Sequence, residues 1–259
     1  IVGNFANIQN LTGGTGVDTF DMAANVTGTV RGGAGDDLFN INAGGLTLTL
    51  VGDAGIDTLR GPDVANIWSV GTAGTGTLNT TIAFSQMESL VGALNQNDTF
   101  NFTVTPANAL VAVDGRGQTT GDTVSFSTVS GAVDITIGAA GYNDIEQFTG
   151  NGTGTLTGAN IANNWDITGL NSGALNLTTT FSGFNNITGG TNTDSFTLGA
   201  SGSISGAING GGAGGANTLI GRNADNSWAI TGPNTGTLGE TAAAPALYEA
   251  NFSNIQNLV

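Results

Sequence analysis

The chain ends by repeating the sequence near its beginning. Residues 4–12 read NFANIQNLT and residues 251–259 read NFSNIQNLV, which match at seven of nine positions. The spacing of this motif, an aromatic residue followed by two apolar residues at steps of three, also recurs between the two ends. The copies are Phe5/Ile8/Leu11, Phe84/Met87/Leu90, Tyr142/Ile145/Phe148, Phe181/Phe184/Ile187 and Phe252/Ile255/Leu258. Such self-similarity predicts a stack of related structural units.

The three tryptophans mark a second repeat. Each has a leucine nine positions before it and another ten positions after it, in the sets Leu59/Trp68/Leu78, Leu156/Trp165/Leu175 and Leu219/Trp228/Leu238. The third copy reaches its next phenylalanine eight residues later than the other two, so we expect an inserted loop within 239–248. These offsets predict one continuous solenoid over 1–259, a segment of a longer array. Its sub-repeats cover about 5–83, 84–180 and 181–251, and the next copy begins at 252.

A third motif, Asp or Asn followed by Thr or Ser and an apolar residue, sets the finest period. It occurs at Asp18, Asp57, Asp98, Asp122, Asp194 and Asn217, with a variant at Asp37. The steps from position 18 to 37, 37 to 57, 98 to 122 and 194 to 217 are similar in length, and the step from 57 to 98 is interpreted as two of them. The period is therefore about 20 residues, within the range of known repeat proteins.

Apolar residues alternate after these motifs, as in Leu46/Leu48/Leu50 and Phe100/Phe102/Val104, and glycine-rich turns separate the alternating runs. This pattern predicts short, half-buried strands and very little helix. A sandwich built from hairpins would space its strands irregularly. The regular period instead favours an all-β fold, a parallel β-solenoid (right-handed β-helix) of about 12–13 coils, with like residues stacked in columns.

Composition excludes several functions. The chain has no Cys, His or Lys, so it cannot form a Ser-His-Asp triad, a Schiff-base lysine, or a thiolate or imidazole metal site. A formal net charge of −15 argues against nucleic acid as a partner. No apolar run is long enough for a membrane span, so we expect no membrane insertion.

Two glycine-rich motifs contain the candidate metal ligands. Residues 13–18 and 32–37 both follow the pattern G-G-x-G-x-D and end at Asp18 and Asp37. This pattern resembles the RTX-type calcium-binding repeat of secreted bacterial proteins, which implies Ca²⁺ held between adjacent turns. The RTX spacing of nine residues is doubled here, and later copies replace the carboxylate by an amide at Asn217. The alternative is that Asp18 and Asp37 are structural corner residues that bind backbone groups and need no cofactor.

Two further classes of function are weighed. A carbohydrate-cleaving enzyme needs a carboxylate pair outside the repeat, whereas the close pairs Asp36/Asp37 and Asp53/Asp57 belong to the repeating motif, so we expect no catalytic residues and no enzyme. A carbohydrate-binding protein could use the tryptophans as a stacking platform. Their identical surroundings in sequence favour packing in the core.

Taken whole, the repeats resemble those of large repetitive β-solenoid exoproteins of bacteria, such as adhesins, surface-layer proteins and filament proteins. The resemblance implies a non-catalytic, structural or adhesive protein that is secreted to the bacterial cell surface, where coil stacking forms a stiff stalk or fibre. Its partners would be flanking repeats or further copies of itself, joined head to tail at the solenoid ends. A calcium-binding β-roll and a carbohydrate-binding or carbohydrate-cleaving β-helix remain the alternatives.

Overall fold

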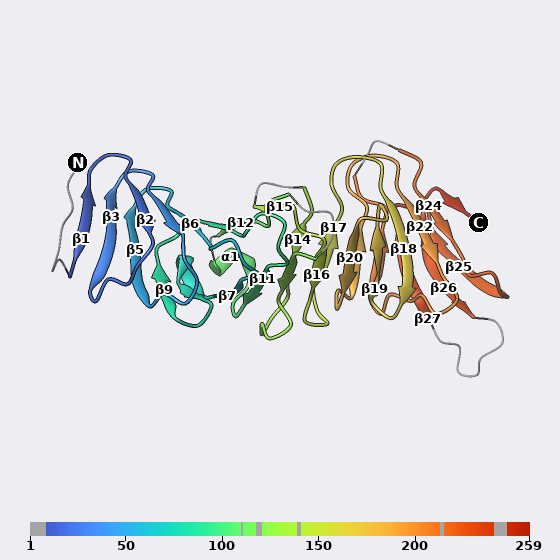
Figure 1. Ribbon diagram of the computed structural model, residues 1–259. Coiled ribbons are helices and arrows are strands. Elements are labelled where there is room, and N and C mark those ends of the chain that lie inside the picture. Colours follow the sequence, from blue (N-terminus) through green and yellow to red (C-terminus); the bar gives the residue numbers. More distant parts are fainter. Residues whose placement is uncertain (1–8, 110, 118–120, 139–140, 213–214, 241–247) are drawn as a thin grey trace. The chain divides into compact units, whose positions relative to one another are not determined.

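The computed structural model describes residues 9–109, 111–117, 121–138, 141–212, 215–240 and 248–259. The chain is all-β, and most strands pair in parallel with equivalent strands of the coils before and after them (Figure 1). The predicted parallel β-solenoid is thus confirmed. Two compact units make up the chain, one of residues 1–124 with 140–145 and one of residues 125–139 with 146–259.

The first unit contains two sheets. One has the strand order β1-β3-β5-β9-β8-β7-β11 and the other the order β2-β4-β6-β10-β12-β15. The strands are β1 (Leu11–Gly14), β2 (Thr19–Met22), β3 (Thr29–Ala34), β4 (Leu38–Ile41), β5 (Leu48–Ala54), β6 (Thr58–Arg60), β7 (Ile67–Val70), β8 (Gly76–Leu78), β9 (Ile82–Ser85), β10 (Ser89–Val91), β11 (Thr99–Phe102), β12 (Ala112–Asp114) and β15 (Tyr142–Asn143). Two short helices lie between strands, η1 (Thr72–Gly74) and α1 (Pro106–Ala109).

The second unit also contains two sheets, with the strand orders β16-β20-β19-β18-β22-β24-β28 and β14-β17-β21-β23-β27-β26-β25. Its strands are β14 (Ile135–Thr136), β16 (Gln147–Thr149), β17 (Thr155–Thr157), β18 (Asn164–Gly169), β19 (Ser172–Leu175), β20 (Thr179–Ser182), β21 (Asn186–Thr188), β22 (Ser195–Leu198), β23 (Ala207–Asn209), β24 (Thr218–Ile220), β25 (Asn226–Gly232), β26 (Thr235–Glu240), β27 (Tyr248–Ser253) and β28 (Asn257–Leu258). Strand β13 (Thr123–Ser125) falls on the sequence boundary between the units.

Columns of equivalent apolar side chains form the core. Phe20 pairs with Phe39 and Phe39 with Leu59 on β2, β4 and β6, and their side chains turn inward because strand residues alternate between faces. The rings of Phe20 and Phe39 are stacked, with centroids 5.0 Å apart. In the second unit, Leu156, Ile187 and Ile208 form a similar column. One coil cannot bury such residues alone, so each coil depends on its neighbours.

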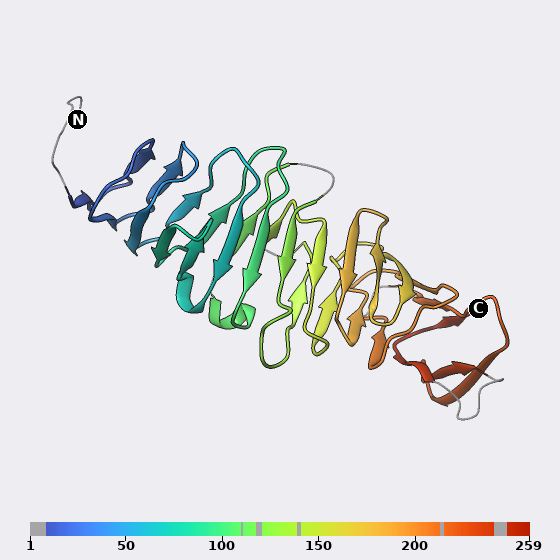
Figure 2. The same ribbon diagram turned by 60° about the horizontal axis from the view of Figure 1, so that its bottom comes forward.

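Three antiparallel meanders interrupt the parallel stacking, which the sequence pattern did not predict. Trp68 pairs with Leu78 across the antiparallel strands β7 and β8, and β8 pairs with β9 in the same manner. These strands belong to the teal part of the chain in Figure 2. Trp165 pairs in the same way with Leu175, and Trp228 with Leu238. The leucine ten positions after each tryptophan is therefore its cross-strand partner.

The meanders also correct the interpretation of the period. Simple coils advance by 19 or 20 residues, as from Asp18 to Asp37 and from Asp37 to Asp57. A coil that contains a meander is longer, because Leu59 of β6 pairs next with Leu90 of β10. The interval from Asp57 to Asp98 is thus not two equal steps. The sequence predicts an inserted loop within 239–248. Strand β26 ends at Glu240 and β27 begins at Tyr248, and residues 241–247 lie outside the described residues.

Truncation of a stacked core residue tests this architecture. Phe39 is fully buried between Phe20 and Leu59, so we expect Phe39→Ala to lower the free energy of unfolding by about 3–5 kcal/mol. Ile56 is 64% exposed at a corner, and Ile56→Ala should change it by less than about 0.5 kcal/mol. Urea unfolding followed by tryptophan fluorescence compares the two variants. Equal losses would contradict the assignment of Phe39 to the core.

Candidate functional site

The two residues predicted as metal ligands lie on successive coils. Asp18 precedes β2, Asp37 precedes β4, and these strands pair in parallel. The Asp37 carboxylate accepts a hydrogen bond from the backbone N–H of Asp18, with an N···Oδ1 distance of 2.8 Å. The side chain of one coil thereby holds the backbone of the coil before it.

The same bond recurs from coil to coil and forms what we call a corner ladder. In each step, a corner residue donates its backbone N–H to the side-chain oxygen of the corner residue in the next coil. The ladders run Asp18–Asp37–Asp57–Glu88, Asn66–Asp98–Asp122 and Asn163–Asp194–Asn217–Gln256, with N···O distances of 2.7–2.9 Å. Buried backbone donors require an acceptor, and the ladders supply it.

Glycine is required where the ladder packs against the backbone. A Cβ atom on Gly32 would collide with Oδ2 of Asp37, and a Cβ atom on Gly13 with Oδ2 of Asp18. Gly33 has φ +108°, a conformation that side-chain-bearing residues rarely adopt. The G-G-x-G-x-D pattern therefore has a structural explanation: the first glycine makes room for the carboxylate and the second makes the corner.

The second carboxylate oxygen of the ladder residue Asp194 is buried in surroundings that disfavour a negative charge. Oδ2 of Asp194 is buried without a hydrogen-bond partner, and both it and the Gly210 carbonyl lie against the Cα of Gly189. Burial raises the pKa of Asp194, and it likewise raises the pKa of Asp57 and Asp98 above the ordinary value. A neutral carboxylic acid or an amide can donate a hydrogen bond at this position, whereas an ionised carboxylate cannot.

The corner aspartates have structural contacts that compete with the binding of calcium. Ca²⁺ takes six to eight oxygen ligands. Among the residues that the structure describes, no three acidic side chains come together in a group that could hold a metal ion. Asp37 uses Oδ1 for the Asp18 N–H, and its Oδ2 is buried beside Gly32. Calcium at Asp18 and Asp37 remains an untested prediction, and the geometry favours the alternative of a structural corner.

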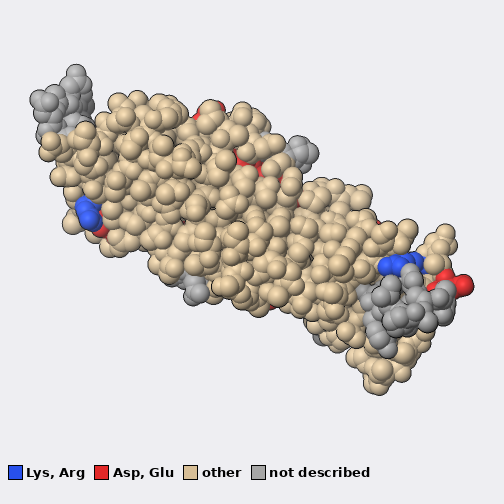
Figure 3. All heavy atoms as spheres, turned by 90° about the horizontal axis from the view of Figure 1, so that it is seen from below, with Lys and Arg blue, Asp and Glu red and all other residues tan. Residues whose placement is uncertain are grey.

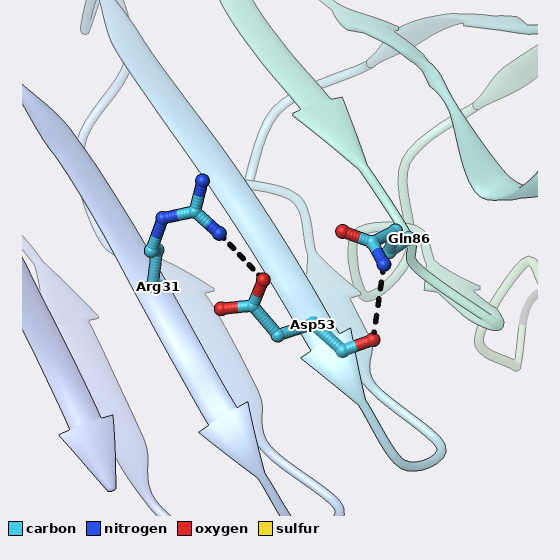
Figure 4. A network of polar contacts seen from close by, with 3 residues as sticks. All are labelled: Arg31, Asp53 and Gln86. Atoms are coloured by element: carbon cyan, nitrogen blue, oxygen red, sulfur yellow. Dashed lines mark hydrogen bonds and ion pairs between the residues drawn. The ribbon is translucent and has the colours of Figure 1, made fainter.

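The close acidic pairs have structural partners as well. Asp36 accepts a hydrogen bond from the backbone N–H of Ile56 at 2.8 Å. Asp53 forms an ion pair with Arg31, and its carbonyl accepts a hydrogen bond from the Gln86 side chain, so three adjacent strands are linked (Figure 4). An exposed pair of this kind contributes little to stability. Charged side chains are sparse on the face drawn in Figure 3.

The tryptophans are not equivalent in exposure. Trp68 and Trp165 are fully buried, and each stacks on a phenylalanine of the next coil, Phe100 at 5.4 Å and Phe196 at 5.9 Å between ring centroids. Trp228 is only half-buried, although Phe252 packs against it edge-on. The expected role in core packing therefore describes the first two tryptophans.

Four ladder residues escaped the sequence interpretation: Asn66, Asn163, Glu88 and Gln256. A signal for the first two is present, because an asparagine stands two positions before every tryptophan, at 66, 163 and 226. In both buried cases its side-chain N–H groups bind the carbonyls two and four residues earlier. Glu88 and Gln256 have no common motif with the aspartates and are recognised only from the hydrogen bonds.

Neither the known protein families nor the curated proteins contain a match to this chain. Within the described residues, no helix has the length and apolar character that a membrane crossing requires.

Substitution of a ladder aspartate separates its hydrogen bond from its charge. Asp194→Asn keeps the acceptor for the Asn163 N–H and supplies a donor toward the nearby carbonyls, as Asn217 does in the next coil. We expect Asp194→Asn to leave the free energy of unfolding unchanged or raised. Asp194→Ala should lower it by about 1–3 kcal/mol, because a buried N–H loses its acceptor. Denaturant unfolding measures both, and an equal loss in the two variants would contradict the ladder's role.

The raised pKa values predict greater stability in acid. A folded-state pKa above the unfolded value means that the folded chain binds the proton more tightly. The stabilisation is therefore complete below the ordinary aspartate pKa of 3.8 and is lost as the pH rises through the folded pKa. We expect a higher melting temperature near about pH 4 than near about pH 7.5. In Asp194→Asn the difference should shrink, and a melting temperature that falls on acidification would refute the prediction.

Proposed function

We propose that this chain is a non-catalytic, structural or adhesive repeat protein of the bacterial cell surface, and that its stacked coils form a stiff stalk or fibre. The supporting observation is that the corner side chains bind the backbone of the preceding coil, again and again, in three ladders. These polar groups hold the stack together and are not collected in one place, as a catalytic or metal site would need.

Stiffness follows from the way in which each coil is fixed. Every step between simple coils combines parallel backbone pairing, a column of buried apolar side chains and one ladder bond. Stability in such a stack is approximately a sum of terms between neighbouring coils, so added coils extend it without a new core. A spacer or fibre needs this property, and the partners that suit it are flanking repeats or further copies of the chain.

The alternatives have less support. A carbohydrate-cleaving enzyme needs carboxylates free to act on a ligand, and Asp36, Asp37, Asp53 and Asp57 bind the protein's own backbone or Arg31. A sugar-binding platform needs exposed aromatic rings, and Trp68 and Trp165 are buried. A calcium-dependent β-roll needs a cluster of oxygen ligands that the corner carboxylates do not provide.

Proteolysis with and without a chelator tests the proposal. We expect the chain to resist proteinase K equally in calcium and in EDTA. The corner side chains are held by hydrogen bonds from backbone N–H groups, so the ladders need no metal ion. Gly52→Ala should abolish the resistance, since a Cβ there would collide with the Gln86 carbonyl and with Asp57. Gly44→Ala is the matched control, because open space surrounds that position.

Two results would overturn the proposal. A melting temperature that falls by more than about 10 °C in EDTA would favour the calcium-binding alternative. Release of reducing sugar from a polysaccharide, with loss of this activity in Asp37→Asn, would favour the enzyme.

A further inference from the structure

Three successive corners of the second unit bring the same two groups together. Beside the place that a Cβ atom would take on each corner glycine lie the second side-chain atom of the ladder residue and a backbone carbonyl of the next coil. The pairs are Asn163 Nδ2 with the Gly189 carbonyl, Asp194 Oδ2 with the Gly210 carbonyl, and Asn217 Nδ2 with the Asn254 carbonyl. The three corners can therefore be compared atom by atom.

In the first and third of these corners the side-chain atom is a hydrogen-bond donor. Asn163 donates from Nδ2 to the Gly189 carbonyl at 2.8 Å. Asn217 donates from Nδ2 to the Asn254 carbonyl at 3.1 Å. This contact joins a coil to the next one a second time, beside the ladder bond, and it requires a donor at the second side-chain atom.

Asp194 stands at the same position between the two asparagines. It is 1% exposed, and its Oδ1 accepts the Asn163 backbone N–H at 2.9 Å. Among the described residues, its buried Oδ2 has no hydrogen-bond partner. An ionised carboxylate would turn this charged acceptor toward the Gly210 carbonyl, which is itself an acceptor. A proton on Oδ2 instead supplies the donor that the two neighbouring corners have.

The groups around Asp194 do not favour its charged form. The corner residues of the coils before and after it are Asn163 and Asn217, and neither titrates. On the adjoining elements, Asp166 of β18 is an acid of the same sign, and Arg222, which follows β24, binds a backbone carbonyl. Burial raises the pKa of Asp194, and the hydrogen bonds from Asn163 lower it to a smaller extent.

Asp98 of the first unit shows a ladder corner that needs no proton. Its Oδ1 accepts the Asn66 backbone N–H and its Oδ2 accepts the Ala93 backbone N–H, both at 2.7 Å. Since each oxygen has a donor, an ionised carboxylate satisfies this corner. Asp98 and Asp194 hold equivalent places in their ladders, and the group beside Oδ2 decides whether a proton is required.

We propose that Asp194 is a proton-binding site, in which the proton lies on Oδ2 and the O–H group donates to the Gly210 carbonyl of the next coil. This rests on the proposed function and adds a regulation to it, because the ladder that stiffens the stack then responds to pH. Asn163, Asp194 and Asn217 form a continuous series, and each of the three side chains donates a hydrogen bond to the coil after it.

Ionisation changes the two contacts of Asp194 in opposite ways. The proton passes to solvent water, and the negative carboxylate binds the Asn163 N–H more strongly, because a charged acceptor forms a stronger hydrogen bond. The same charge repels the negative end of the Gly210 carbonyl dipole. Rising pH therefore loosens the step from Asp194 to the next coil and preserves the step to the coil before it. The raised pKa has the same sign, since the stabilisation is present in acid and is lost as the pH rises through the folded-state value.

Carbon-13 NMR of the chain labelled at its aspartate carboxyl groups locates the proton. The signal that disappears in Asp194→Asn is that of Asp194. We expect this signal to keep the chemical shift of a neutral acid while the signals of solvent-exposed aspartates change to that of a carboxylate, as is usual for a buried acid. An Asp194 signal that titrates together with those of exposed aspartates would overturn the proton site.

Amide hydrogen exchange tests the response to pH. The Gly212 N–H binds the Gly190 carbonyl and the Thr218 N–H binds the Asp194 carbonyl, both across the step to the next coil. Once Asp194 has ionised, we expect these two amides to exchange at least about tenfold faster in the wild type than in Asp194→Asn at the same pH, while the Asn163 amide stays protected. Equal exchange in the two chains at every pH would contradict the switch.

Asp98→Asn is the matched control for the amide substitution. An amide at position 98 turns an N–H group toward one of two backbone N–H groups, so we expect a lower urea midpoint for Asp98→Asn. Asp194→Asn should keep or raise the midpoint, because the amide supplies the missing donor. Losses of the same size in the two variants would show that Asp194 acts as a carboxylate, against the proposal.

The outcomes separate this inference from the proposed function. An ionised Asp194 in a chain that still resists proteinase K in EDTA rejects the proton site and retains the structural role. A protonated Asp194 in a chain whose protease resistance depends on calcium retains the proton site and rejects the proposed function.

Discussion

The hydrogen bond from a corner backbone N–H to the side-chain oxygen of the next coil is the contact on which this fold depends. At a corner the chain leaves the sheet, and its amide loses the partner that a strand would provide. Asp37 supplies that partner to Asp18, and Asp194 supplies it to Asn163. Together with the parallel backbone pairing, these bonds hold the corners at a fixed step and so keep the columns of apolar side chains in register. The buried acceptor has a cost, which is visible in the raised pKa of Asp194.

The same bond explains why a motif of calcium-binding proteins can occur without a clustered set of ligands. Glycine and aspartate are needed at Gly32 and Asp37 for reasons of space and hydrogen bonding alone. Asn217 in the equivalent position preserves the acceptor and adds a donor toward Gly210. Replacement of the carboxylate by an amide would weaken a metal site, and it leaves the ladder intact.

Much of the architecture could be predicted from the sequence, since a repeated Asp-Thr-Phe pattern with alternating apolar residues predicts parallel coils. The meanders could not, although the ten-residue spacing of Trp68 and Leu78 was evident. That spacing is compatible either with two positions on successive parallel strands or with a cross-strand pair. The turn at Ala73 and Gly74 between β7 and β8, both with positive φ, decides the matter only in three dimensions. The ladder roles of Glu88 and Gln256 were equally hidden, because longer side chains there replace the aspartate.

The ladders have a direction. Each bond runs from an amide hydrogen of an earlier coil to a side-chain oxygen of a later one, so a coil turns amide donors toward the coil after it and side-chain acceptors toward the coil before it. The two sides of a coil are chemically unlike, as the ends of a polar filament are. The direction of the chain is thus written into the chemistry of every coil, and a coil turned upside down could not take the place of its neighbour.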